Sequence, residues 1–155
     1  MNFLEYLSQP AILCSVTVPW LVVMYWYFKE GRHDPPPQRV IWALMICAVV
    51  TYFNARWEVT AESRSLYAMP TSLIFMIIWI WCRNTISPLT VYSLVFVELF
   101  TVDLAKALEL VPLEHTLETF YWGIGGAGGR DALCIMPLIG AAYVPYLNWR
   151  ISRLK

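Results

Sequence analysis

Charged residues are scarce in this sequence, and their scarcity excludes most soluble folds. Asp, Glu, Lys and Arg together make up 14% of the 155 residues, whereas soluble domains contain about 25%. Apolar residues make up 59%, eight residues are Trp, and the mean hydropathy is +0.54. A soluble domain of this length has too little interior to bury so much apolar surface. The composition therefore predicts an integral membrane protein surrounded by the lipid bilayer.

The sequence also lacks an excess of basic residues and the motifs of common enzymes. It contains 11 Lys and Arg against 11 Asp and Glu, so we expect no nucleic-acid partner, because such binding depends on a basic surface. No GxSxG or HExxH motif occurs, and Cys and His do not cluster. We therefore predict no enzyme, no metal site and no cofactor. The cysteines lack the spacing of a zinc site or redox pair, and we expect free thiols at Cys14, Cys47, Cys82 and Cys134.

Five apolar segments are separated by polar hinges and loops. Lipid offers the backbone no hydrogen-bond partners, so a chain crosses the hydrocarbon core as helices of about 20 apolar residues. Two of the five segments meet this length only marginally. We predict an all-α integral membrane protein with about five transmembrane helices in one domain, residues 1–155. The expected spans are residues 10–28, 40–53, 66–82, 89–111 and 132–149.

The basic residues are divided unevenly between the two sides of this bundle. Short cytoplasmic loops carry an excess of Lys and Arg, and the side that holds the C-terminus has seven of them against three. The seven are Lys29, Arg32, Arg39, Arg83, Arg150, Arg153 and Lys155, and the three are Arg56, Arg64 and Arg130. We therefore predict an outside N-terminus and a cytoplasmic C-terminus, in a bacterial inner membrane. The first ten residues contain an acid and no Lys or Arg, unlike a signal peptide, so we expect an uncleaved first span.

The fourth span contains four ionisable residues, Glu98, Asp103, Lys106 and Glu109. At about 100° per residue they share less than half of the helix circumference, with Tyr92 on the same side. Each ionisable group costs about 2.5–3.5 kcal/mol near the bilayer centre, so such groups rarely face lipid. Lys106 can pair with Asp103 and with Glu109, three residues away on either side. We therefore expect Glu98 to lack a partner, and burial then favours its protonated form.

This polar face has a functional and a structural interpretation. In the functional one, it lines a water-filled path, a seam between subunits or a ligand site. In the structural one, the ion pairs are satisfied inside the bundle and serve as a packing device, while Glu109 reaches interfacial water. A further alternative places residues 106–117 on the membrane surface as an amphipathic helix.

Glycines are concentrated just before the fifth span, in YWGIGGAGGRDALC. The stretch formally matches GxGxxG, but no expected strand precedes it and no acid follows at the required distance, so we reject a dinucleotide site. We expect a flexible loop that re-enters the bilayer edge, binds an anion or only joins two helices, with an acidic N-cap for the last span. Its residues are Gly123, Gly125, Gly126, Gly128, Gly129, Arg130 and Asp131.

The small size, the outside N-terminus, the uncleaved first span, the polar-faced span and the basic tail NWRISRLK resemble the holin-type membrane proteins of phages and prophages. The stretch GIGGAGGRDAL adds to this similarity. The resemblance implies accumulation in the inner membrane, homo-oligomers, and holes that release or activate a cell-wall hydrolase. Size, span number and Trp content are also similar to the tryptophan-rich sensory or translocator proteins, which bind porphyrins and sterols. We rank that similarity lower, because the Pro and Trp patterns differ.

We therefore expect a non-enzymatic, oligomerising inner-membrane protein that permeabilises or perturbs the membrane, as holins do. One alternative is a small channel, carrier or lipophilic-ligand-binding protein that uses Glu98 and Asp103 in the fourth span. Another is an accessory subunit of a larger membrane complex. In each case the partner is the bilayer together with a second copy or another membrane protein.

Overall fold

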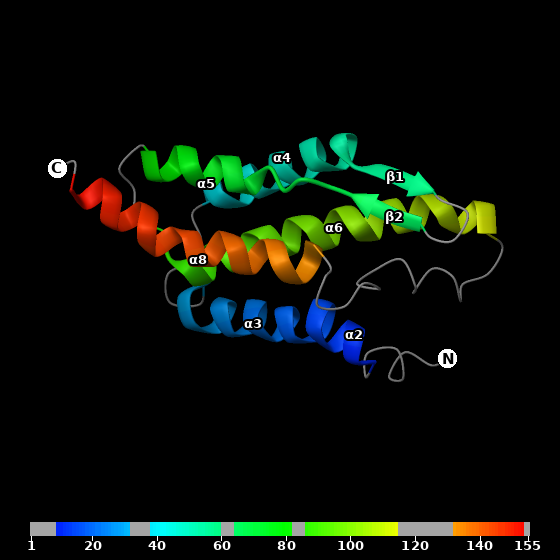
Figure 1. Cartoon of the computed structure of the whole chain (residues 1–155), viewed down its shortest axis with the longest axis horizontal. Helices are drawn as coiled ribbons and strands as arrows, with labels where there is room; N and C mark the ends of the chain where they lie inside the picture. Colours follow the sequence, from blue (N-terminus) through cyan, green and yellow to red (C-terminus); the bar gives the residue numbers. More distant parts are fainter. Residues whose placement is uncertain (1–8, 32–37, 60–63, 82–85, 115–131, 154–155) are drawn as a thin grey trace.

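The computed structural model describes residues 9–31, 38–59, 64–81, 86–114 and 132–153. Helices occupy five segments, and one short β-hairpin lies between the second and the third (Figure 1). The first segment joins α2 (Pro10–Ile12), the π-helix η1 (Leu13–Thr17), α3 (Val18–Trp26) and the π-helix η2 (Tyr27–Gly31). The others are α4 (Gln38–Asn54), α5 (Ser72–Trp81), α6 (Pro88–Glu114) and α8 (Ala132–Ser152), and the hairpin pairs β1 (Arg56–Val59) with β2 (Arg64–Tyr67). The expected helical fold is therefore confirmed.

The helices lie side by side along the long axis and alternate in direction (Figure 1). Two hydrogen bonds connect the beginning of α6 to the neighbouring helices α3 and α8. The indole N–H of Trp26 donates to Thr90 Oγ1 at 3.1 Å, and the amide of Asn148 donates to the carbonyl of Ile86 at 3.2 Å. The first helical segment begins toward one end of the bundle, and α8 ends at the opposite end (Figure 1).

Two helical segments of the described chain are long and apolar enough to cross a membrane, residues 10–29 and 132–150. Only 28% and 22% of the most apolar window in these stretches is buried, and about half of their apolar side chains are exposed. The outward faces of the shorter helices are also apolar. Examples are Trp42, Met45, Ile46, Val49, Val50 and Phe53 on α4, and Ile74, Ile77 and Ile78 on α5. Soluble monomers rarely expose continuous apolar surface on this scale.

The third helix is shorter than the sequence indicated. Residues 66 and 67, expected to begin a span, belong to β2, and α5 begins only at Ser72. Residues 56–59, expected in a polar loop, alternate polar and apolar as a strand does and pair with residues 64–67. Pro70 disfavours helical geometry at Met69, which prevents the helix from starting earlier. The ten residues of α5 cover about 15 Å.

The core of the bundle surrounds α6. Phe96 is fully buried, and Trp20 of α3 packs edge-on against it and against Phe100, with ring centroids 5.6 and 5.3 Å apart. On the other side, α8 approaches at Gly140. A Cβ atom there would lie 2.9 Å from Leu73 Cδ2 and 3.2 Å from Val91 Cγ1, so the missing side chain allows close packing of α5, α6 and α8.

Candidate functional site

Helix α5 begins inside the bundle, and its first backbone N–H groups therefore need partners there. Pro70 and Ser72 are both buried at this point. The first N–H groups of a helix have no acceptor within the helix. Each such group left unpaired in the interior costs about 1–3 kcal/mol. An acceptor from another part of the chain is therefore required.

Glu98 of α6 supplies this acceptor. Its Oε1 accepts a hydrogen bond from the backbone N–H of Thr71 at 2.9 Å, and its Oε2 accepts one from the N–H of Ser72 at 3.0 Å. The side chain of Glu98 has no exposed surface. A negative charge at a helix N-terminus is also favoured by the helix dipole. Glu98 thus caps α5 from a neighbouring helix.

Two threonine hydroxyl groups complete the surroundings of this carboxyl group. Thr51 Oγ1 on α4 donates to Glu98 Oε1 at 2.6 Å, and Thr71 Oγ1 lies 3.0 Å from the same oxygen. The two hydroxyl oxygens are 3.0 Å apart. We refer to Glu98, Thr51, Thr71 and Ser72 as the Glu98 site. It joins α4, α5 and α6 at one point.

Each threonine hydroxyl in the Glu98 site has a second acceptor within reach. Thr51 Oγ1 lies 3.3 Å from the carbonyl of Met69, and Thr71 Oγ1 lies 3.0 Å from the carbonyl of Cys47. A hydroxyl carries one proton, so each threonine donates to Glu98, to its carbonyl or to the other threonine hydroxyl. The hydroxyl groups can therefore turn between the carboxyl group and a backbone carbonyl by rotation of the hydroxyl alone.

The expectation that Glu98 lacks a partner is wrong. It rested on pairs within one helix, whereas the actual partners lie 26 to 47 residues away along the chain. One local signal does occur in the sequence, because Thr71 and Ser72 after Pro70 are typical of a helix start. That signal gives the position of the helix start. It does not indicate which acid caps it.

The other residues of the expected polar face lie apart from this site. Lys106 points to α4, with Nζ 4.1 Å from the centroid of the Tyr52 ring. Tyr92 is buried in the apolar core, and Asp103 is half-buried. The side chain of Glu109 is outside the described part of the structure. Helix α6 continues without a break to Glu114, so residues 106–114 are not a separate surface helix.

The expected glycine loop, residues 123–131, is also outside the described residues. Cys14, Cys47 and Cys134 are free thiols, and Cys82 is not among the described residues. Within the described ranges, no three His, Cys, Asp or Glu side chains are placed to hold a metal ion. Comparison with known proteins finds no matching family model, curated protein or solved structure.

Proposed function

We propose that this chain is an integral membrane protein with five spans, an outside N-terminus and a cytoplasmic C-terminus. The alternating helix directions, the outward apolar side chains and the two long apolar helices support this proposal. The uneven distribution of Lys and Arg gives the orientation. Lys29 and Arg150 fall at the end that we assign to the cytoplasm.

We further propose that the protein is a small proton-linked channel or carrier in which Glu98 takes up and releases the proton. The observation that carries this proposal is the pair of threonine hydroxyls, each with one acceptor on Glu98 and another on a backbone carbonyl. Such a site accommodates both the charged and the neutral carboxyl group without movement of a helix. Ionisable groups at membrane depth commonly mark proton and ion pathways.

The depth of Glu98 supports the same function. It lies ten residues into α6, about 15 Å from the start of that helix, and the hydrocarbon core is about 30 Å thick. Helix α5 begins at this level, as broken helices do at the binding sites of many transporters. Other titratable groups on the adjoining helices are Arg39, Cys47 and Tyr52 on α4, and Tyr92, Asp103, Lys106, Glu109 and Glu114 on α6.

Proton flux into liposomes tests this function. The purified protein is reconstituted with an internal pH-sensitive dye, and a potassium gradient with valinomycin imposes the membrane potential. We expect flux with the wild type, none with Glu98→Gln, and reduced flux with Glu98→Asp. Asp103→Asn removes another carboxylate from α6 and separates a general charge effect from an effect specific to Glu98. Wild-type flux through a folded Glu98→Gln protein would contradict the proposal.

A second candidate function, the holin-like oligomer, is favoured by the apolar surface of α4. The six exposed large apolar side chains that the structure describes on this helix are suited to contact another copy of the chain as well as lipid. In that case Glu98→Gln shifts the time or threshold of membrane damage after induced expression, and does not abolish it. Unchanged membrane potential and viability at high expression would exclude this candidate. Purification as a defined complex with another protein would instead favour an accessory subunit.

A further inference from the structure

Three aromatic rings follow one another along the last turns of α8. Tyr143, Tyr146 and Trp149 are spaced three residues apart, and successive ring centroids lie 5.5 and 6.1 Å from each other. Each side chain is about half exposed. The rings therefore form a partly open aromatic strip at the end of a helix that is long and apolar enough to span a membrane.

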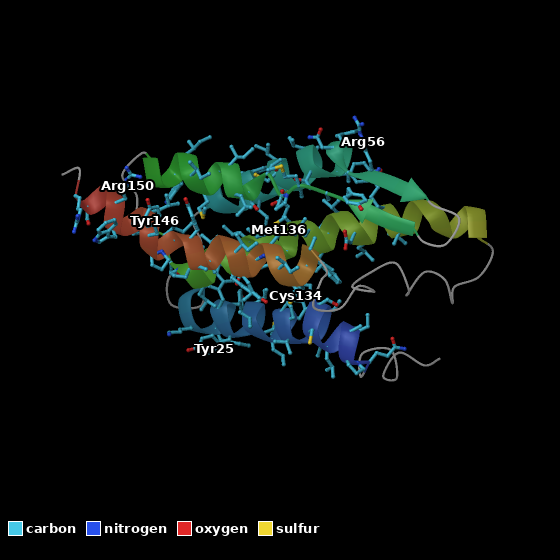
Figure 2. The ribbon with its side chains drawn as sticks, viewed as in Figure 1. Tyr25, Arg56, Cys134, Met136, Tyr146 and Arg150 are labelled. Carbon is cyan, nitrogen blue, oxygen red and sulfur yellow. The ribbon has the colours of Figure 1, made fainter. Side chains whose placement is uncertain are left out.

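Two arginines are held on this strip. Arg150 Nη1 donates a hydrogen bond to the hydroxyl of Tyr146 at 3.2 Å, and the guanidinium carbon of Arg153 lies 4.2 Å from the centroid of the Trp149 ring. Both arginines are exposed. Figure 2 shows Arg150 and Tyr146 together near the end of α8, while Arg56 lies near β1. A guanidinium group has five N–H donors, so these contacts leave donors available to a ligand.

A similar contact occurs at the end of the first helical segment. Lys29 Nζ lies 5.4 Å from the centroid of the Tyr25 ring. This segment finishes in the same half of the bundle as α8 (Figure 1). Cations placed on aromatic rings are thus found on two helices in the half that we assign to the cytoplasm.

We propose that the end of α8, formed by Tyr143, Tyr146, Trp149, Arg150 and Arg153, binds the headgroups of anionic phospholipids in the cytoplasmic leaflet. The proposal rests on the membrane orientation given above and is independent of proton transfer. Tyr and Trp favour the depth of lipid headgroups, and the planar fork of Arg matches the oxygens of a phosphate group. Near an anionic surface each basic residue strengthens binding about fivefold.

The affinity of the full-length protein for single lipids tests the proposal. Protein extracted from membranes in mild detergent is titrated with phosphatidylglycerol or phosphatidylcholine, and bound lipid is counted by native mass spectrometry. The double variant Arg150→Gln with Arg153→Gln removes the two guanidinium groups. The matched control, Arg56→Gln with Arg64→Gln, removes the same charge from the hairpin. Circular dichroism verifies the helical content of each protein.

We expect the wild type to prefer phosphatidylglycerol, and the α8 double variant to lose about 25-fold in affinity for it, as two fivefold contributions multiply. The hairpin control should keep the wild-type preference. Equal affinity of both double variants for phosphatidylglycerol, or no lipid preference in the wild type, would overturn the lipid proposal. A chain that fractionates with soluble proteins and needs no detergent would instead overturn the membrane assignment on which it rests.

Discussion

Glu98 and Ser72 lie on different helices, yet Glu98 Oε2 accepts a hydrogen bond from the backbone N–H of Ser72 at 3.0 Å. This bond lets α5 begin within the bundle and not at its edge. The same carboxyl group contacts Thr51 of α4. One side chain thereby fixes the relative positions of three helices, which makes the site important for stability as well as for the proposed function.

Replacing Glu98 with Ala should destabilise the protein strongly. The change leaves the N–H group of Ser72 without its acceptor in the interior and leaves the N–H group of Thr71 with only Thr51 Oγ1, at 3.2 Å, so we expect a loss of about 1–3 kcal/mol in the free energy of unfolding. Unfolding in mixed micelles with increasing SDS, followed by circular dichroism, measures the loss. Thr101→Ala is the control, because Thr101 is exposed and bonds only to its own helix at Val97. Equal stability of the two variants would rule out the capping role.

Replacing Thr51 with Val tests the hydroxyl groups separately from the carboxyl group. Val has nearly the same shape but cannot donate to Glu98 Oε1, so we expect a loss of about 1–3 kcal/mol in stability and a lower proton flux in liposomes. Thr101→Val makes the same chemical change outside the site and should leave both measurements near the wild-type values. If Thr51→Val alters stability and leaves flux unchanged, the hydroxyl has no part in proton transfer.

Replacing Gly140 with Val tests the close approach of α8. The new side chain would overlap Leu73 and Val91, and we expect a cost of about 1–3 kcal/mol from overpacking. Ala142→Val, at an exposed position of the same helix, should change stability by less than about 0.5 kcal/mol. The same unfolding measurement compares them. A Gly140→Val variant with the same free energy of unfolding as the wild type would show that Leu73 and Val91 do not pack closely against α8 at this position.

The membrane orientation is tested by reporter fusions at Lys155 and within residues 123–129. We expect a reporter that is active in the cytoplasm to work at Lys155, and a reporter that is active outside to work in the glycine segment. The physical reason is the excess of Lys and Arg on the C-terminal side. Both positions on the same side would mean that α8, the helix between them, does not cross the membrane, and would contradict the five-span threading.

The sequence was sufficient to predict the five helical segments, because long apolar runs carry a strong signal. It was insufficient for the hairpin, since strands of four residues such as Arg56–Val59 give a weak alternation that a run of charges obscures. The placement of Glu98, an ionisable residue, within an apolar helix could be predicted from the sequence. Its capping of Ser72 could not, because that contact joins residues 26 positions apart and depends on how the helices pack.

The central claim is that Glu98 takes up a proton inside the bundle. Infrared difference spectroscopy of the reconstituted protein, recorded as the pH is lowered, detects the carbonyl band of a newly protonated carboxylic acid. We predict such a band in the wild type, its loss in Glu98→Gln, and its retention in Asp103→Asn. A band that is unchanged in Glu98→Gln, while the protein keeps its helical content, would show that another group takes up the proton and would contradict the account.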